Sequence, residues 1–133
     1  MSMTSFTVKS RLRNEMIDIT HEVAQAVSQA GVQSGVCYLH VPHTTAAITI
    51  NENADPDVRR DILSALARAF PQHGDYRHSE GNSDAHIKTS LVGSSVMVLI
   101  ESGRLVLGTW QSIFFCEFDG PRTRKVHCKV MHS

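Results

Sequence analysis

At 133 residues, the chain has the length of one domain and can bury a hydrophobic core. Its hydrophobic fraction of 41% and charged fraction of 20% are those of an ordinary folded protein. The 13 basic and 13 acidic side chains cancel, which argues against a nucleic-acid-binding protein and against electrostatic attachment to a membrane.

The 3 cysteines all lie in apolar segments, at Cys37, Cys116 and Cys128. An odd number without a regular spacing argues against a disulfide scaffold and favours a reducing compartment, with each thiol a small buried hydrophobe. The first ten residues hold no long apolar run, so we expect neither a signal peptide nor a membrane anchor. These features predict a cytoplasmic protein.

The first half of the chain alternates between strand and helix patterns. Ser5–Leu12 alternates apolar and polar side chains, which is typical of a strand with one wet face. From Asp18 the apolar period becomes helical, with Asp18 as a possible N-cap and Gly31 where a helix ends. Gly35–Val41 is a nearly continuous apolar run, which predicts a buried strand. Pro42 then breaks the pattern.

A second helix is predicted after the strand Ala46–Ile50. Asp55 followed by Pro56 supplies an N-cap and a proline at the first helical position, and this capping role outweighs a catalytic one for Asp55. Pro71 ends the helix. Its expected buried stripe consists of Val58, Ile62, Ala65, Leu66 and Ala69.

The second half of the chain is rich in strand patterns. Expected strands are Ile87–Leu91, Ser94–Ile100, Arg104–Leu107, Thr109–Phe118 and Lys125–Met131. No repeat or linker interrupts the chain, so the sequence predicts one α+β domain over residues 1–133. Two amphipathic helices cover its sheet or sheets.

The stretch His78–Lys88 is strongly polar between apolar segments, as functional loops often are. Imidazoles and carboxylates are the usual ligands of transition metals, so a metal site that also includes His43 from the Pro42 break is one reading. Capping of backbone groups at loop ends is an equal alternative. Lys88 reads as a solvated side chain at the start of the next strand. The candidate site residues here are His78, Glu80, Asp84 and His86.

Two further groups have open interpretations. Trp110 and Gln111 follow a glycine and could line a pocket, although a core tryptophan is an equal alternative. Arg122 and Arg124 share a strand face, where a solvated charged face is the usual explanation and phosphate binding the minority one. Glu52 has no capping role to explain it and is a candidate acid.

Four blocks carry a resemblance to a known family: HTTAAITINENADPDV (43–58), HSEGNSDAHIKTSLVGSS (78–95), GRLVLGTWQSIFF (103–115) and EFDGPRTRKV (117–126). They resemble the YjbQ family, also called the secondary thiamine-phosphate synthase family. The resemblance implies a single-domain α+β fold whose sheet or sheets are mostly antiparallel, assembled as a homotrimer. It also implies a weak activity that joins a pyrimidine diphosphate to a thiazole phosphate and releases pyrophosphate. The signature histidines of the family fall on His43, His78 and His86, which favours a metal-binding or catalytic cluster.

We therefore expect an enzyme that acts on a small phosphorylated substrate with a divalent metal, zinc or magnesium. Glu52, Glu80 and Asp84 are the candidate catalytic acids, and Trp110, Gln111, Arg122 and Arg124 are the candidate substrate-binding residues. A metal-dependent hydrolase with ligands His43, His78 and His86 is one alternative. A trimeric anion-binding or regulatory protein without turnover is another.

Overall fold

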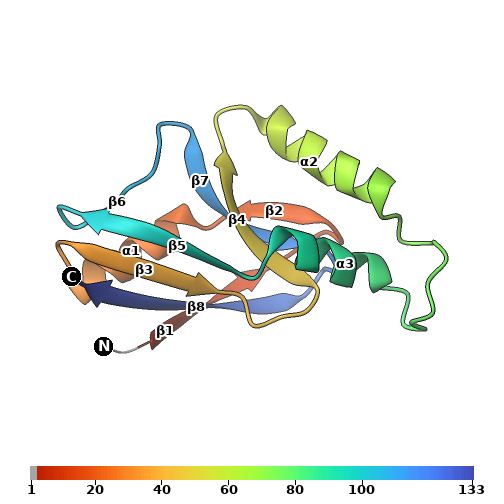
Figure 1. Ribbon diagram of the computed structural model, residues 1–133, viewed down its shortest axis with the longest axis horizontal. Helices are drawn as coiled ribbons and strands as arrows, with labels where there is room; N and C mark the ends of the chain where they lie inside the picture. Colours follow the sequence, from red (N-terminus) through yellow and green to blue (C-terminus); the bar gives the residue numbers. More distant parts are fainter. Residues whose placement is uncertain (1–2) are drawn as a thin grey trace.

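Two antiparallel sheets form the frame of the protein (Figure 1). The structure is a computed structural model that describes residues 3–133. The five-stranded sheet has the order β1 (Met3–Lys9), β8 (Thr123–His132), β3 (Gly35–His40), β5 (Ser95–Glu101) and β6 (Arg104–Leu105). The three-stranded sheet has the order β2 (Glu15–Asp18), β7 (Gln111–Glu117) and β4 (Ala46–Glu52). The helices are α1 (Thr20–Ala30), α2 (Pro56–Ala69) and α3 (Ser83–Val92). This architecture confirms the predicted α+β fold with mostly antiparallel sheets.

Strand β7 is buried on both faces, which explains its apolar run. Ile113 and Phe115 pack into a cluster with the five-stranded sheet and with Val27 of α1. Phe114 and Cys116 alternate with them and pack on the opposite face, against partly buried side chains of α2. The three-stranded sheet therefore lies between the larger sheet with α1 on one side and the helices α2 and α3 on the other. Figure 1 shows α2 and α3 at the end of the molecule away from the C-terminus.

The predicted helix boundaries are confirmed at two points and need one correction. Gly31 ends α1 with a left-handed φ of 69°, and Asp55 caps α2 by accepting a hydrogen bond from the Asp57 N–H at 2.9 Å. At the start of α1 the cap position is Ile19 instead of Asp18. The Asp18 carboxylate still accepts hydrogen bonds from the N–H and hydroxyl of Thr20, at 2.9 and 2.6 Å.

A third helix was not predicted, and the strand expected at Ile87–Leu91 is wrong. This segment belongs to α3, whose buried positions are Asp84, Ala85, Lys88 and Thr89. Lys88 is 2% exposed, so the prediction of a solvated side chain is also wrong. Asp84 and Lys88 lie one helical turn apart and pair with each other at 2.9 Å. The buried face of α3 is polar, so the helix lacks the hydrophobic period that would have identified it.

Helix α2 packs less deeply than its sequence suggests. The structure buries none of its residues, and Ala65 and Ala69 of the expected stripe are exposed. Ile62, Leu63 and Leu66 are half-buried against the cluster that contains Phe114 and Phe118. Within residues 3–133, the structure holds no helix that is both long enough and apolar enough to cross a membrane.

Candidate functional site

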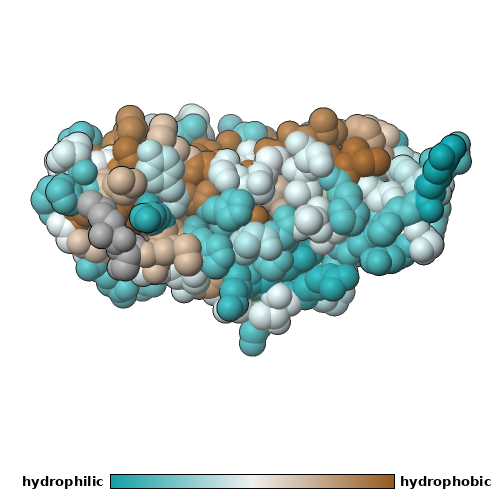
Figure 2. Space-filling view, turned by 60° about the horizontal axis from the view of Figure 1, so that its bottom comes forward, coloured by the Kyte–Doolittle hydropathy of each residue, from teal (hydrophilic) through white to brown (hydrophobic). Residues whose placement is uncertain are grey.

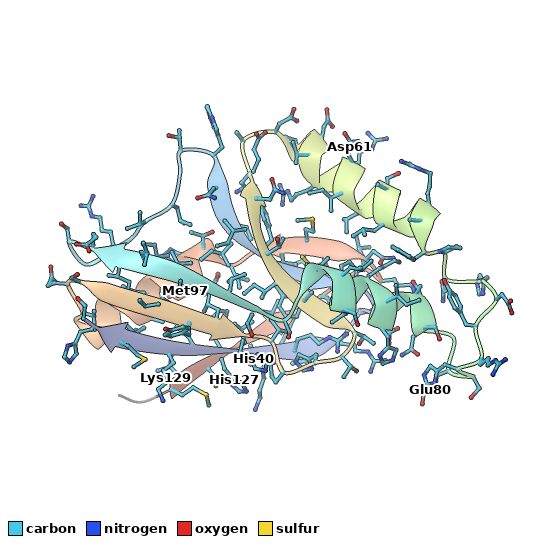
Figure 3. The ribbon with its side chains drawn as sticks, viewed as in Figure 1. His40, Asp61, Glu80, Met97, His127 and Lys129 are labelled. Atoms are coloured by element: carbon cyan, nitrogen blue, oxygen red, sulfur yellow. The ribbon has the colours of Figure 1, made fainter. Side chains whose placement is uncertain are left out.

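A polar cavity of about 350 Å³ lies where the loop after β3 meets the start of α3 and the turn between β7 and β8. Its position follows from breaks in the hydrophobic pattern of the sequence. Pro42 follows the end of β3, and the polar residues before α3 and after β7 do not join the hydrophobic core. Figure 3 labels Glu80 in the loop that leads into α3. The lining residues are Pro42, His43, Thr44, Thr45, Glu80, Asn82, His86, Asp119, Arg122 and Arg124.

His43 is held as a neutral imidazole. Its Nε2 accepts a hydrogen bond from the backbone N–H of Lys125 at 2.9 Å. Burial lowers the pKa of His43, and the positive charge of Arg124 lowers it further. A neutral ring whose Nε2 accepts a hydrogen bond carries its proton on Nδ1. His43 therefore has an N–H donor, not a free lone pair, available for a ligand.

Arg124 is committed to a buried ion pair with Glu117. Its Nε donates to the Glu117 carboxylate at 2.9 Å, and a terminal nitrogen donates to the hydroxyl of Thr45 at 2.9 Å. Burial would raise the pKa of Glu117, but hydrogen bonds from Arg124 and Ser10 outweigh it and lower the pKa below its usual range. Glu117 was not predicted from the sequence, where its only signal is an acid at the end of an apolar strand. Arg124 reaches the cavity, with part of its donor capacity already used.

A chain of alternating charges runs from beneath α3 to the cavity. Lys88 binds Asp84 at 2.9 Å, and Asp84 binds Arg13 at 2.9 Å. Arg13 binds Asp119 at 3.1 Å, and Asp119 binds Arg122 at 3.1 Å. Burial would raise the pKa of Asp84, but its hydrogen bond to Lys88 and the charges of Lys88 and Arg13 lower it. Three cations and two anions leave a net charge of one positive unit, and the chain ends at Arg122 on the cavity.

Asp84 is thus a buried structural ion rather than an acid free for catalysis. Its side chain is 1% exposed, and it does not line the cavity. Asn82, which the sequence analysis did not select, does line it and donates through Nδ2 to the Asp119 carboxylate at 2.9 Å. The Oδ1 atom of Asn82 is buried without a hydrogen-bond partner within residues 3–133.

The three candidate metal ligands do not converge on one point. His78 and His86 meet edge to face, with ring centroids 5.5 Å apart, and both line a second cavity of about 450 Å³. His43 lines only the first cavity, and its Nε2 is engaged by Lys125. Across residues 3–133, no three His, Cys, Asp or Glu side chains are grouped so that they could hold a metal ion. In this arrangement the donor set does not fit a three-histidine site.

Glu80 lies near the histidines but is highly exposed. Its carboxylate lies 3.8 Å from Nε2 of His78, and its side chain is 72% exposed. An ion pair at this distance and exposure contributes little to stability. Glu80 is therefore an exposed acid in the lining of the cavity, available to a ligand.

Glu52, Trp110 and Gln111 form a separate group. Glu52 ends β4 and lies opposite Gln111 in the register, whereas the cavity lies beyond the Ala46 end of the same strand. Seven residues of strand place the two ends about 20 Å apart. Trp110 is 62% exposed, and Gln111 binds the Gly108 N–H within its own turn at 2.8 Å. Within one chain these residues cannot contact a ligand in the cavity.

The chain is similar to proteins of one family along almost its whole length. A family model described as UPF0047 protein YjbQ-like matches residues 4–133. The chain is 52% identical over 130 residues to the UPF0047 protein YugU of Bacillus subtilis, with 97% of this chain and 98% of that protein covered. It is 50% identical over 126 residues to a UPF0047 protein of Methanocaldococcus jannaschii, with 95% and 91% covered.

Solved structures agree with this assignment. A YjbQ/UPF0047 family protein of Clostridium acetobutylicum matches with a TM-score of 0.95 and 56% identity, covering 96% of this chain and 99% of that one. A protein of unknown function from Sulfolobus solfataricus matches with a TM-score of 0.94 and 31% identity, covering 99% and 97%. Sequence, fold and family match agree that the chain belongs to the YjbQ-like UPF0047 family.

Proposed function

We propose that the protein binds a phosphorylated small molecule in the cavity lined by His43, Asn82, His86, Arg122 and Arg124, and acts on it. The supporting observation is that the charge chain ends on the cavity lining at Arg122, where His43 and Thr45 add further hydrogen-bond donors. A guanidinium group suits a phosphate because its planar donors match the phosphate oxygens. The volume of about 350 Å³ lies within the range of small-molecule sites.

The reaction we propose is the secondary thiamine-phosphate synthase activity implied by the family resemblance. When a pyrimidine diphosphate is joined to a thiazole phosphate, negative charge develops on the departing pyrophosphate. Fixed donors aimed at such a charge lower the barrier without reorganisation. Arg122, with Asp119 holding it, is the residue we expect to stabilise the leaving group, and Glu80 and His86 are the nearest candidates for proton transfer.

Product formation from the two phosphorylated precursors tests this proposal. The protein should be purified from a host that lacks the dedicated synthase, so that traces cannot supply the activity. We expect Arg122→Gln to lower the rate by about tenfold to a hundredfold, as expected for the loss of one charged donor. Arg104→Gln, on the short strand β6, is the matched control and should keep the wild-type rate. Absence of product from the wild type would reject the reaction.

Binding without turnover is the second candidate, and the state of the carboxylates favours it. The carboxylates that line the cavity are Asp119 and Glu80. Asp119 is paired with Arg13 and Arg122, and Glu80 is exposed, so neither has the half-buried, unpaired setting that tunes a catalytic acid. Pyrophosphate should then raise the melting temperature without being consumed. Turnover of either precursor by the wild type would exclude this version.

A divalent metal, zinc or magnesium, stays a prediction in its own right. Elemental analysis of protein purified without a histidine tag measures it directly. A stoichiometric metal would show that the histidines rearrange on binding, because His43 must release the Lys125 N–H before its Nε2 can become a ligand. Metal far below one equivalent, with the same pyrophosphate affinity after chelation, would contradict the metal-dependent hydrolase.

We also propose that the chain assembles as the homotrimer implied by the resemblance. Large apolar side chains are exposed on the outer face of three adjacent strands of the larger sheet. Tyr38 is paired with Met97, and Val36 lies between Leu99 and Met131 in the register. Exposed apolar patches of this kind mark protein contacts, so a second copy is the occupant we propose for this face.

A further inference from the structure

Arg13 lies outside the cavity lining, yet it contacts both halves of the structure that support the cavity. Its side chain comes from the segment between β1 and β2. One terminal nitrogen binds Asp84 of α3 at 2.9 Å, and the other binds Asp119 of the turn after β7 at 3.1 Å. The helix that carries His86 and the turn that carries Arg122 are thus joined by one guanidinium group.

The backbone around Arg13 holds the same turn. The Arg13 carbonyl accepts a hydrogen bond from the Gly120 N–H at 3.1 Å. Ser10 exchanges two hydrogen bonds with the backbone of Arg122, at 3.0 and 2.8 Å. The approach is close enough that a Cβ at Gly120 would lie 2.3 Å from the Leu12 carbonyl oxygen. The turn therefore has little freedom to shift, and the direction of its side chains is set by their own partners.

Asp119 is the junction of these partners. Its Oδ1 binds Arg13, and its Oδ2 accepts from Asn82 Nδ2 at 2.9 Å and from Arg122 at 3.1 Å. The Asp119 side chain is 10% exposed, so water cannot readily replace a lost partner. Without Arg13, nothing within residues 3–133 would hold Oδ1, and rotation of the carboxylate would release Asn82 and Arg122 together.

We propose that Arg13 is a positioning residue of the cavity: by binding Asp84 and Asp119 at once, it fixes Asp119 and thereby the direction of Arg122 and Asn82 toward an anionic ligand. The inference rests on the anion binding proposed above. It assigns Arg13 a role that charge alone does not explain. A lysine keeps the charge, but its single ammonium on a flexible stem cannot reproduce the fork that spans two carboxylates.

Calorimetric titration with pyrophosphate tests the inference in four proteins. Arg13→Lys keeps the charge, Arg13→Gln removes it, and Arg11→Gln removes an exposed arginine two residues away as the matched control. We expect Arg11→Gln to bind as the wild type does. Arg13→Lys should keep a near-normal melting temperature yet lose about tenfold in affinity, the size of one charge-assisted hydrogen bond. Arg13→Gln should lose more.

Two further readouts separate positioning from a general structural role. The side-chain Nε–H signal of Arg122, which donates to the Asp119 carbonyl at 2.8 Å, should shift or broaden in NMR spectra of Arg13→Lys but not of Arg11→Gln. In a double-mutant cycle, Arg13→Lys should add almost nothing to Asp119→Asn, because the effect of Arg13 passes through Asp119. This cycle also serves if Arg13→Gln does not fold.

The outcomes are distinct. If the wild type does not bind pyrophosphate, the proposed anion-binding function is wrong. The Nε–H signal of Arg122 in Arg13→Lys then tests by itself whether Arg13 positions Arg122. An unchanged Arg122 signal in Arg13→Lys overturns the inference. Wild-type pyrophosphate affinity in Arg13→Lys also overturns it, and so do additive effects of Arg13→Lys and Asp119→Asn in the double-mutant cycle. A pyrophosphate affinity that falls in proportion to the melting temperature across all variants would show a general structural role instead.

Discussion

Two carboxylates beneath the cavity, Asp84 and Glu117, are buried and remain ionised because each has a cationic partner. Asp84 lies between Lys88 and Arg13, and Glu117 binds Arg124. Their pKa values are lowered although burial opposes this, so the hydrogen bonds and charges exceed the cost of desolvation. A pair of this kind contributes little net stability when intact and costs much when one partner is removed.

These lowered pKa values predict acid sensitivity. The folded pKa of each carboxyl lies below its unfolded value of about 4, so its stabilisation is fully present above about pH 5 and is lost as pH falls through the folded pKa. Asp84→Asn leaves Lys88 buried without its partner and should lower the free energy of unfolding by about 3–5 kcal/mol at pH 7. Urea denaturation from pH 3 to 7 measures both effects. The free energy of unfolding of Asp84→Asn should fall less steeply with decreasing pH than that of the wild type. Parallel pH dependences for the two proteins would contradict a lowered pKa of Asp84 in the folded state.

The site residues that could be predicted from the sequence are those that lie at breaks in its hydrophobic pattern. His43 follows Pro42, Glu80 and His86 lie in the polar stretch, and Arg122 follows a turn; the structure places all four around one cavity. The residues whose role arises from long-range pairing were not predicted. Arg13 meets Asp119 across most of the chain, and neither has a local signal. Trp110 was predicted to belong to the site for the same reason, because its place also depends on long-range strand pairing. Only the register of β4 and β7 shows that it lies at the end of β4 away from the cavity.

At the scale of elements, α3 shows where hydrophobic periodicity fails. Its buried face carries Asp84 and Lys88 at helical spacing, and these residues look solvated in the sequence. Ala85 is its one fully buried apolar side chain, and Val92 at its end packs against the same core only partly buried. A helix whose buried face is an ion pair gives no hydrophobic period, whereas α1, which buries Val23 and Val27, was predicted with its C-cap.

Helix α2 gives a prediction at the same scale. Asp55 caps the helix from outside the cavity, so Asp55→Ala should remove about 1 kcal/mol of helix stability and leave pyrophosphate affinity unchanged. Amide hydrogen exchange should quicken across α2 and stay unchanged in α1, because only half-buried side chains hold α2 to the core, whereas α1 buries Val23 and Val27. A lower affinity in Asp55→Ala would show a role in binding that capping does not explain.

At the scale of the whole molecule, the outer face of the larger sheet is the main exposed apolar surface outside the cavities. Met97 is 55% exposed, Leu99 53%, Tyr38 46% and Met131 42%. Figure 3 labels His40, Met97, His127 and Lys129 on β3, β5 and β8. Next to the apolar side chains runs a polar row, in which His40 binds Ser95 at 2.9 Å and His127 binds Ser5 at 2.7 Å. His40 is exposed although it lies on β3, whose alternate residues Cys37 and Leu39 are buried.

The mixed character of this face suits contact between copies. Figure 2 shows hydrophobic surface in brown along the upper border and hydrophilic surface in teal over the middle and lower part of that view. In such a contact the apolar side chains would supply the association energy, and the polar row beside them would restrict how a partner can dock. Most of the cavity residues lie in loops beyond the strand ends, and Arg124 lies at the start of β8 with its side chain buried, so assembly through this face would leave the cavity open to a ligand.

Sedimentation equilibrium tests the assembly. The wild type should sediment at three times the 14.7 kDa chain mass. Leu99→Lys places a charge in the middle of the apolar patch and should shift the equilibrium toward the single chain, since a buried unpaired charge costs several kcal/mol. Leu91→Lys is the matched control, because Leu91 is 63% exposed on α3 and lies away from the patch. A wild type that sediments as a single chain would reject the homotrimer, and equal dissociation of both variants would place the interface elsewhere.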